Sequence, residues 1–195
     1  LAARFDLATE IGELKRTAGT PFYVPAREER LLTELEALCG TEGIHISRTA
    51  LRSIWREIIS ASIAQEKVHT IAFLGPEATF TEQAAQQAFG RSQSYTALPT
   101  IADIFCAVSR GEAEYGVIPI ENSVGGAVFH SLDMLAETDL KIVSQVYLGI
   151  EHCLISHCDL SEIREVRSKD QALLQCRQWL QRNLPNAKQV DVEST

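Results

Sequence analysis

The chain has 195 residues, 45% of them hydrophobic and 23% charged, which is enough for one or two domains with cores of their own. Its formal net charge of -8, with no long basic run, argues against a nucleic-acid-binding protein. No apolar stretch approaches the roughly 18 residues of a membrane span, and the first residues lack a signal-peptide pattern. Five cysteines, an odd number, indicate free thiols in a reducing compartment, so we expect a cytoplasmic protein.

Residues 1–67 carry helical patterns and no strand pattern. The first helix is expected to run to residue 15 or 16, the second over 25–39 and the third over 48–67. The expected breakers are Gly19, Gly40 and Gly43, and Ser47 can cap the third helix. The chain begins inside the first helical pattern and ends on a strand-like run, VDVEST. We therefore expect a fragment of a longer protein, with the first helix truncated.

From Val68 onward, short apolar runs alternate with helical patterns, which predicts an α/β domain with a largely parallel sheet over residues 68–195. The expected strands are 71–75, 94–99, 115–122 and 141–156, the last range holding one long strand or two. The expected helices are 79–90, 100–111, 126–138 and 169–184. Ligands of such sheets bind beyond the carboxyl ends of the strands, so the turns GPEATF and PIENSVGG are the candidate binding segments.

Each of the three N-terminal helices carries polar residues on its apolar stripe, counted at about 100° per residue. These residues are Arg4 and Lys15 in the first helix, Arg27 and Glu28 in the second, and Ser62 and Glu66 in the third. Taken singly, they are explained by long side chains near helix ends that reach water or form salt bridges. As a set they indicate a site between the helices for a small anion with more than one carboxylate, because unpaired buried charges are costly.

The segments ATEIGELK, FYVPAREERLL and IWREIISASIAQE resemble the all-helical type of chorismate mutase. That family rearranges chorismate to prephenate, without covalent catalysis, by holding a compact dianion and stabilising charge on its ether oxygen. The resemblance implies that Arg4 binds a carboxylate, that Lys15 serves a carboxylate and the ether oxygen, and that Glu28 accepts from the ring hydroxyl. Arg27 and Ser62 complete the polar lining.

Glu66 stands where the resemblance places the second donor to the ether oxygen. A carboxyl group donates only when protonated, so we expect either that the surroundings of Glu66 make it hold its proton more tightly or that the activity favours lower pH. In relatives, an upstream part of the first helix supplies a further arginine from the partner chain of a dimer. The resemblance therefore implies a homodimer formed through the helical domain.

The second half of the chain resembles prephenate dehydratases, a family with a two-lobed α/β fold like that of periplasmic binding proteins. GPEATFT follows the pattern G-P-x-G-T-F-S, with Ala78 and Thr81 in place of Gly and Ser. PIENSVGG follows P-I-E-N-S-x-x-G, and SKDQALLQC follows S-H-P-x-x-x-x-Q-C with two replacements. The last three residues match a family E-S-T. The alternative is helix capping, by Thr79 in the first turn and by Asn122 or Ser123 in the second.

The dehydratase reaction removes water and carbon dioxide from prephenate and leaves phenylpyruvate. The resemblance implies substrate binding by Thr79, Thr81, Asn122, Ser123, Ser168 and Gln175, with Glu121 and Asn122 as catalytic candidates. The family's acid is a threonine in a downstream T-R-F motif, which this chain does not contain. Its phenylalanine-sensing regulatory domain, the ACT domain, is not represented in the sequence either.

Together the two resemblances imply a bifunctional enzyme of phenylalanine biosynthesis whose ligands are chorismate and prephenate, with no cofactor, nucleic acid or membrane as partner. The alternative is a non-catalytic, two-lobed α/β module that binds small carboxylates and is fused to a helical domain. The run EHCLISHC also offers two His-Cys pairs to a metal. Cys153 and Cys158 face opposite sides of a strand, so core packing is the favoured interpretation and no metal site is expected.

Overall fold

The computed structural model of the chain describes residues 1–41, 43–123 and 125–192. The described residues form two compact units. The first comprises Leu1–Pro119 and His130–Leu148, and the second comprises Ile120–Phe129 and the chain from Gly149 onward. Three helices precede an α/β region with parallel sheets, as the sequence predicts. None of the helices in the described ranges is long and apolar enough to cross a membrane.

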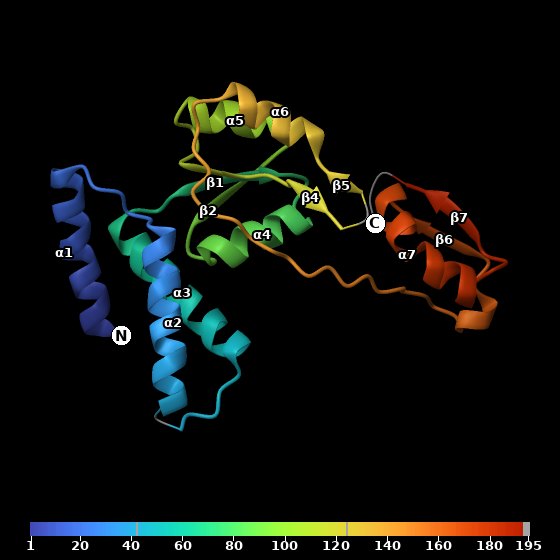
Figure 1. The fold of residues 1–195 in the computed structure, drawn as a ribbon, viewed down its shortest axis with the longest axis horizontal. Coiled ribbons are helices and arrows are strands. Elements are labelled where there is room, and N and C mark those ends of the chain that lie inside the picture. Colours follow the sequence, from blue (N-terminus) through green and yellow to red (C-terminus); the bar gives the residue numbers. More distant parts are fainter. Residues whose placement is uncertain (42, 124, 193–195) are drawn as a thin grey trace. The chain divides into compact units, whose positions relative to one another are not determined.

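The N-terminal helices are α1 (Ala2–Ala18), α2 (Pro25–Thr41) and α3 (Arg48–Glu66), shown in Figure 1. Gly19 ends α1 with a left-handed backbone at φ 64°, a conformation that glycine adopts without steric cost. The Ser47 hydroxyl caps α3 by accepting a 3.1 Å hydrogen bond from the Ala50 N–H, as predicted. The expected break at Gly40 is wrong, because α2 continues to Thr41. One glycine costs a helix only about 1 kcal/mol, which packing can offset.

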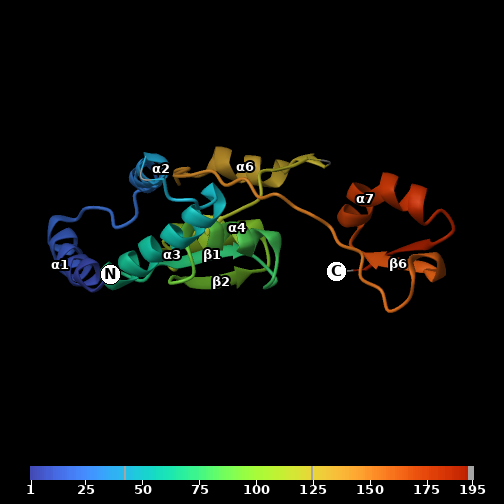
Figure 2. The ribbon, with the colours of Figure 1, turned by 90° about the horizontal axis from the view of Figure 1, so that it is seen from below.

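The sheet of the first unit consists of three parallel strands in the order β2-β1-β3, namely β1 (Thr70–Leu74), β2 (Ser94–Leu98) and β3 (Tyr115–Val117). Helices α4 (Phe80–Phe89) and α5 (Ile101–Ser109) cover its opposite faces (Figure 1). Side chains alternate along β1, so Ile71 and Phe73 pack with α4, whereas Ala72 packs against Ile104 of α5. Helix α3 lies beside α4 on the same face, where Ile63 packs on the core (Figure 2).

The second unit contains a short hairpin and a small parallel sheet. Its elements are β4 (Glu121–Asn122), β5 (Gly126–Ala127), the short 3-10 helix at Leu160–Glu162, β6 (Glu165–Ser168), α7 (Asp170–Asn183) and β7 (Lys188–Asp191). Strands β4 and β5 pair antiparallel, and β6 pairs parallel with β7 under α7. Helix α6 (Phe129–Glu137) follows β5 and, apart from Phe129, belongs to the first unit.

The predicted strand over 115–122 is interrupted. Strand β3 ends at Val117, and Glu121 and Asn122 belong to the separate β4–β5 hairpin. Pro119 lies between the two strands and has no N–H to donate to a ladder, which explains the interruption. Glu121 and Asn122 were expected to lie directly at the end of the buried strand. They lie instead in a separate hairpin.

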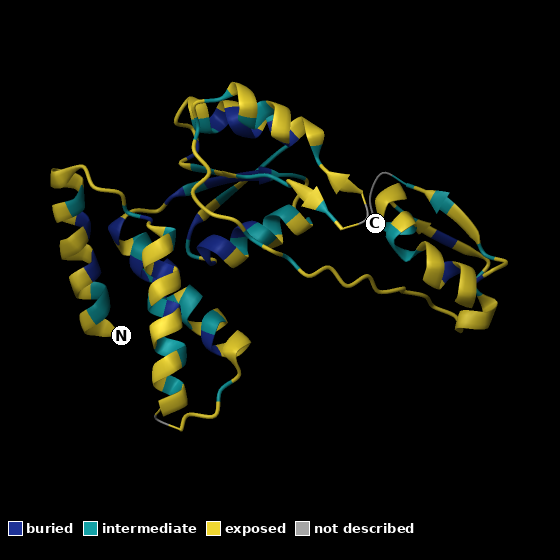
Figure 3. Cartoon of the chain, in the orientation of Figure 1, coloured by how far each residue is buried: buried dark blue, intermediate teal, exposed yellow. Residues whose placement is uncertain are grey.

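The predicted strand over 141–156 is wrong. The backbone of residues 139–156 is assigned to no strand or helix, and most of its side chains are exposed (Figure 3). Tyr147 and Ile155 are 80% and 91% exposed. An apolar run becomes a strand only where a neighbouring strand pairs with it, and none of the strands among the described residues does so here.

Candidate functional site

A pocket of about 440 Å³ lies between α1, α2 and α3. Its lining includes all six polar residues singled out on the three helical stripes: Arg4, Lys15, Arg27, Glu28, Ser62 and Glu66. The rest of the wall is mainly apolar, from residues such as Leu7, Ile11 and Ile59. The helical packing therefore gathers residues that are up to 62 positions apart (Arg4 to Glu66) around one cavity.

Two contacts across the pocket join α1 to α3. The Lys15 Nζ atom lies 2.6 Å from the Glu66 Oε2 atom, and both side chains are largely buried. The Arg4 Nε atom donates a 2.8 Å hydrogen bond to the Ser62 hydroxyl. Arg16 adds a third link, because its Nη1 atom donates to the backbone carbonyl of Glu66 at 2.9 Å. Lys15 and Glu66 are therefore paired inside the bundle and do not reach out to solvent.

Glu28 is buried in the pocket wall with one carboxylate oxygen paired and the other unpaired. Its Oε2 atom accepts a hydrogen bond from Arg56 of α3. Its Oε1 atom is buried and has no hydrogen-bond partner. Burial raises the pKa of Glu28 from 4.5 to about 7, and the positive charge of Arg56 opposes that rise. A buried acceptor without a partner is a natural contact for a hydroxyl group of a ligand.

Arg56 is a residue that the sequence analysis missed. A signal for it existed, because a buried acid such as Glu28 calls for a cation on a facing helix. The pocket as a whole holds three cations, Arg4, Lys15 and Arg27, against the carboxyl groups of Glu28 and Glu66. This balance favours binding of an anion.

Gly12 permits the close packing of α1 on α3. A methyl group added at Gly12 would lie 2.8 Å from the Cα atom of Glu66, closer than real contacts allow. The glycine thus brings the backbones together at the height of the pocket. Because the α1 and α3 backbones lie this close, the Lys15 ammonium group can contact the Glu66 carboxylate.

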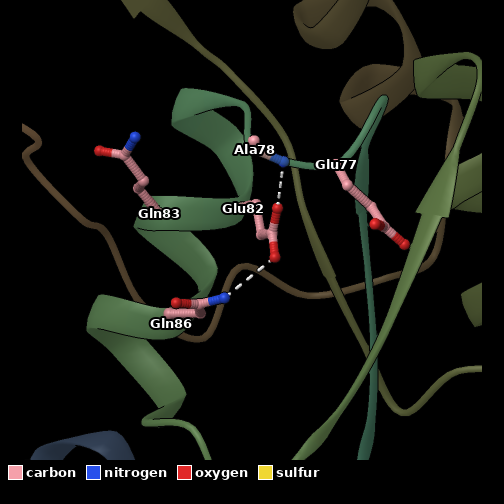
Figure 4. Close-up of a pocket in the computed structure, with 5 residues that line it drawn as sticks. All are labelled: Glu77, Ala78, Glu82, Gln83 and Gln86. Carbon is pink, nitrogen blue, oxygen red and sulfur yellow. Dashed lines mark hydrogen bonds between the residues drawn. The ribbon is translucent and has the colours of Figure 1, made fainter.

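The turn after β1 behaves as a helix cap. The Thr79 hydroxyl accepts from the Glu82 N–H at 3.4 Å and donates to the Leu74 carbonyl at 3.1 Å. The Glu82 carboxylate accepts from the Ala78 N–H at 2.5 Å and from the Gln86 amide at 3.0 Å (Figure 4). One backbone N–H of the candidate binding turn GPEATF is therefore satisfied by the protein's own acid.

The capping alternative for Thr79 is thus realised, and Thr81 lies half-buried in the first turn of α4. Ala78 has a positive φ of 62°, which is uncommon for a residue with a side chain and explains why relatives are expected to carry glycine there. A shallow pocket of about 330 Å³ borders this turn, lined by Glu77, Ala78, Glu82, Gln83 and Gln86 (Figure 4).

In the second unit, three polar side chains form a hydrogen-bonded row. Gln175 of α7 donates from its Nε2 atom to the Asn122 Oδ1 atom at 2.9 Å. The Gln175 Oε1 atom lies 2.5 Å from the His152 Nε2 atom. Because Gln175 uses its amide nitrogen toward Asn122, its oxygen accepts, and His152 must donate from Nε2. Asn122 also accepts from the Gly125 N–H at 3.3 Å, so it closes the turn and does not cap α6.

The remaining predicted residues of this unit are less enclosed. Glu121 and Ser123 are exposed on and beside the hairpin, and Ser168 is half-buried at the carboxyl end of β6. The structure brings Asn122 and Gln175 together as a pair. Thr79 and Thr81 belong to the first unit.

His152 is the second residue that the sequence analysis missed, since it considered the EHCLISHC run for metal binding and core packing alone. Cys153 and Cys158 are both exposed, so the expected core packing of these thiols is wrong. No group of three or more His, Cys, Asp or Glu side chains in the described residues could hold a metal ion. The five cysteines, all within the described ranges, are free thiols.

Comparison with known proteins assigns the two parts of the chain to different family models. Residues 71–195 match the model for prephenate dehydratase, and residues 1–67 match the model for chorismate mutase type II. The bifunctional chorismate mutase/prephenate dehydratase of Aquifex aeolicus is 43% identical over the whole chain, and the match covers 54% of that relative. The enzyme of the same name from Neisseria gonorrhoeae is 41% identical, with 53% of its length covered.

A solved structure adds a comparison in three dimensions. Prephenate dehydratase from Arthrobacter aurescens, in complex with L-Phe, aligns with a TM-score of 0.52 and 34% sequence identity. The alignment covers 65% of this chain and 43% of that chain. The chain spans about half the length of the two curated relatives, 54% and 53% respectively.

Proposed function

Because the chain belongs to the prephenate dehydratase family and carries a type II chorismate mutase match ahead of that region, we propose that it is part of a bifunctional enzyme of phenylalanine biosynthesis. Residues 1–67 rearrange chorismate to prephenate, and residues 68–195 contribute to the conversion of prephenate to phenylpyruvate. The main support for the mutase activity is that six polar residues from three helices line one pocket.

In the mutase pocket, the cations hold the dianion and the acids orient it. Arg4 and Arg27 bind carboxylates, and Lys15 lies within reach of a carboxylate and the ether oxygen. The unpartnered Oε1 atom of Glu28 accepts from the ring hydroxyl. Glu66 donates to the ether oxygen when it is protonated. Such pre-placed donors act on charge that develops in the transition state, and each is worth about 100-fold to 1,000-fold in rate.

In the dehydratase part, Asn122 and Gln175 bind prephenate and His152 orients Gln175. The hydrogen bonds that join these three side chains support this assignment. Ser168 and Ser123 are further contacts in the same unit, and Glu121 is the acid–base candidate. Thr79 and Thr81 of the first unit are substrate-binding candidates through the resemblance to prephenate dehydratases. The reaction loses a hydroxyl as water and a carboxylate as carbon dioxide, so it needs a proton donor at the hydroxyl and none at the carboxylate.

A crossed pair of variants tests both activities in the full-length protein. Lys15→Ala is expected to lower kcat/KM for chorismate about 100-fold or more and to leave prephenate turnover within threefold. Gln175→Ala is expected to do the reverse, lowering prephenate turnover alone. The matched controls are Arg30→Ala and Gln181→Ala, which change exposed residues of α2 and α7. A protein that converts neither chorismate nor prephenate would refute the proposal.

The non-catalytic alternative is not favoured, because the most similar relatives reported above are enzymes of both kinds. We further propose that the protein is cytoplasmic, as its five free thiols favour, and that it is a homodimer through the helical domain. Leu7 and Leu14 of α1 support the dimer, since they are 57% and 69% exposed on an apolar stripe. Sedimentation of the full-length protein would measure the assembly state.

A further inference from the structure

The turn between α1 and α2 connects the mutase pocket to the core of the α/β region. Phe22 in this turn lines the pocket. Its carbonyl accepts a hydrogen bond from the Lys15 Nζ atom at 3.3 Å, and Nζ lies 5.8 Å from the centre of its ring. The ring of Phe22 also meets the ring of buried His69 edge-on, at 6.0 Å between centroids. The position of Lys15 therefore depends on where Phe22 is held.

The next residue, Tyr23, is buried in the α/β core, with 7% of its surface exposed. Its ring centroid lies 4.7 Å from that of Phe89 on α4 and 5.2 Å from that of Tyr115 on β3. The other buried members of this cluster come from β1 and α4: Ile71, Phe73, Ala85, Ala88 and Phe89. Two consecutive residues thus contact two different regions. Phe22 contacts Lys15 in the pocket, and Tyr23 packs in the core between the sheet and α4.

The opposite wall of the pocket is fixed to the same region. The Ser60 hydroxyl of α3 accepts from the Ser92 N–H at 3.2 Å, and the Ser60 carbonyl accepts from the Gln93 amide at 3.1 Å. Gly90 makes room for this contact, since a methyl group there would lie 2.4 Å from the Ser60 Cβ atom. Helix α3 carries Glu66 at its end. The α/β core therefore holds both partners of the Lys15–Glu66 pair, Lys15 through Phe22 and Glu66 through helix α3.

We propose that Tyr23 is a positioning residue of the mutase pocket: its ring, buried in the α/β core, holds Phe22 and through Phe22 sets the Lys15 ammonium opposite Glu66. This inference rests on the proposed mutase function, and it makes the mutase geometry dependent on the core of the dehydratase region. Catalytic groups have to be held within about 0.5 Å of their productive geometry, so a small relaxation of the turn is enough to matter.

The test compares two substitutions that both remove core packing. Tyr23→Leu removes the ring contacts on the α4 face of the sheet. Ile104→Ala is the matched control, because Ile104 is also buried but packs on the α5 face, with Ala72 and Ala107. Mutase kinetics are measured in the full-length protein at a temperature at which circular dichroism shows both variants folded.

We expect Tyr23→Leu to lower kcat/KM for chorismate at least tenfold, mainly through a higher KM, since Lys15 contacts the substrate carboxylate. Tyr23→Phe keeps the ring and is expected to restore kcat/KM to within threefold of the wild type, and Ile104→Ala is expected to stay within the same range. The inference is overturned if Tyr23→Leu stays within threefold, or if Ile104→Ala loses as much activity as Tyr23→Leu.

A second measurement separates this inference from the proposed function. The ion pair with Glu66 protects the Lys15 ammonium protons from exchange with water, and nuclear magnetic resonance can follow that exchange. Tyr23→Leu is expected to speed it at least fivefold, while Ile104→Ala leaves it unchanged. If the wild type shows no mutase activity but the exchange result holds, the positioning role stands and the proposed function fails. Unchanged exchange in Tyr23→Leu overturns the positioning role whatever the activity.

Discussion

Glu28 is an acid whose surroundings disfavour its ionised form. Burial raises its pKa from 4.5 to about 7, even though Arg56 lies against one of its oxygens. A raised pKa means that the folded protein binds this proton more tightly than the unfolded chain does. The stability that Glu28 contributes is therefore fully present below pH 4.5 and is lost as the pH rises through about 7.

We expect the free energy of unfolding of the wild type to fall by about 2 kcal/mol between pH 5 and pH 8 relative to Glu28→Gln, which cannot ionise. Urea unfolding at the two pH values measures the difference. Glu34→Gln, an exposed substitution on the same helix, is the control and is expected to behave like the wild type. A wild type and Glu28→Gln variant with parallel pH profiles would contradict the prediction.

The six polar residues on the helical stripes could be found from the sequence, because a period of 3.6 residues reveals which side chains share a face. Their partners could not be found in this way. Which acid meets which cation depends on the register of one helix against another, and that register is decided by packing. Arg56 and Arg16 were missed for this reason, although both contact residues that were found.

The contact between α1 and α3 depends on a single glycine. We expect Gly12→Ala to push the helices apart, because the added methyl group meets backbone at 2.8 Å. The cost is expected to be about 1–3 kcal/mol in the free energy of unfolding, together with a loss of mutase kcat/KM of about tenfold or more. Thermal unfolding and chorismate turnover measure the two effects.

Gly40→Ala is the matched control for Gly12→Ala. It lies inside α2 and has open space where the methyl group would go. It is expected to stabilise the helix by about 0.5–1 kcal/mol and to leave turnover unchanged. If Gly12→Ala were as harmless as Gly40→Ala, the close approach of α1 and α3 would not matter for the pocket.

Some strands were predicted correctly from the sequence and one was not, and the difference lies in whether a neighbouring strand is present. Strands β1 and β2 were predicted within one residue, and each lies next to a parallel partner. The run over 141–156 is also rich in apolar residues but has no strand partner among the described residues. A helix satisfies its own hydrogen bonds, whereas a strand needs a neighbour, so apolar composition alone cannot decide a strand.

Residues 139–148 of the first unit and 149–156 of the second form no helix or strand, and most of their side chains are exposed, although Val146 packs on the core. Proteases act on such segments, because helices and paired strands must first unfold locally. We expect chymotrypsin to cut this chain after Tyr147, which is 80% exposed, at least tenfold faster than after Phe129, which is 74% exposed but helical. Mass spectrometry of the early fragments measures this order.

Tyr147→Ser is the control for that experiment and is expected to remove the early cut. Early cleavage after Phe129 instead of Tyr147 would contradict the prediction. It would mean that α6 unfolds locally faster than the protease cuts the segment around Tyr147. Either result can be read from the two fragment masses alone.

By itself, the sequence determined the class of each half and the polar residues that share the apolar stripe of each N-terminal helix. Those features are local, because they follow from residue type and spacing along one element. The tertiary structure alone decided which of those residues meet, that Tyr23 leaves the helical region for the α/β core, and that His152 lines up with Gln175 and Asn122. Such contacts join distant parts of the chain, and the complementary shapes that select them exist only once the chain is folded.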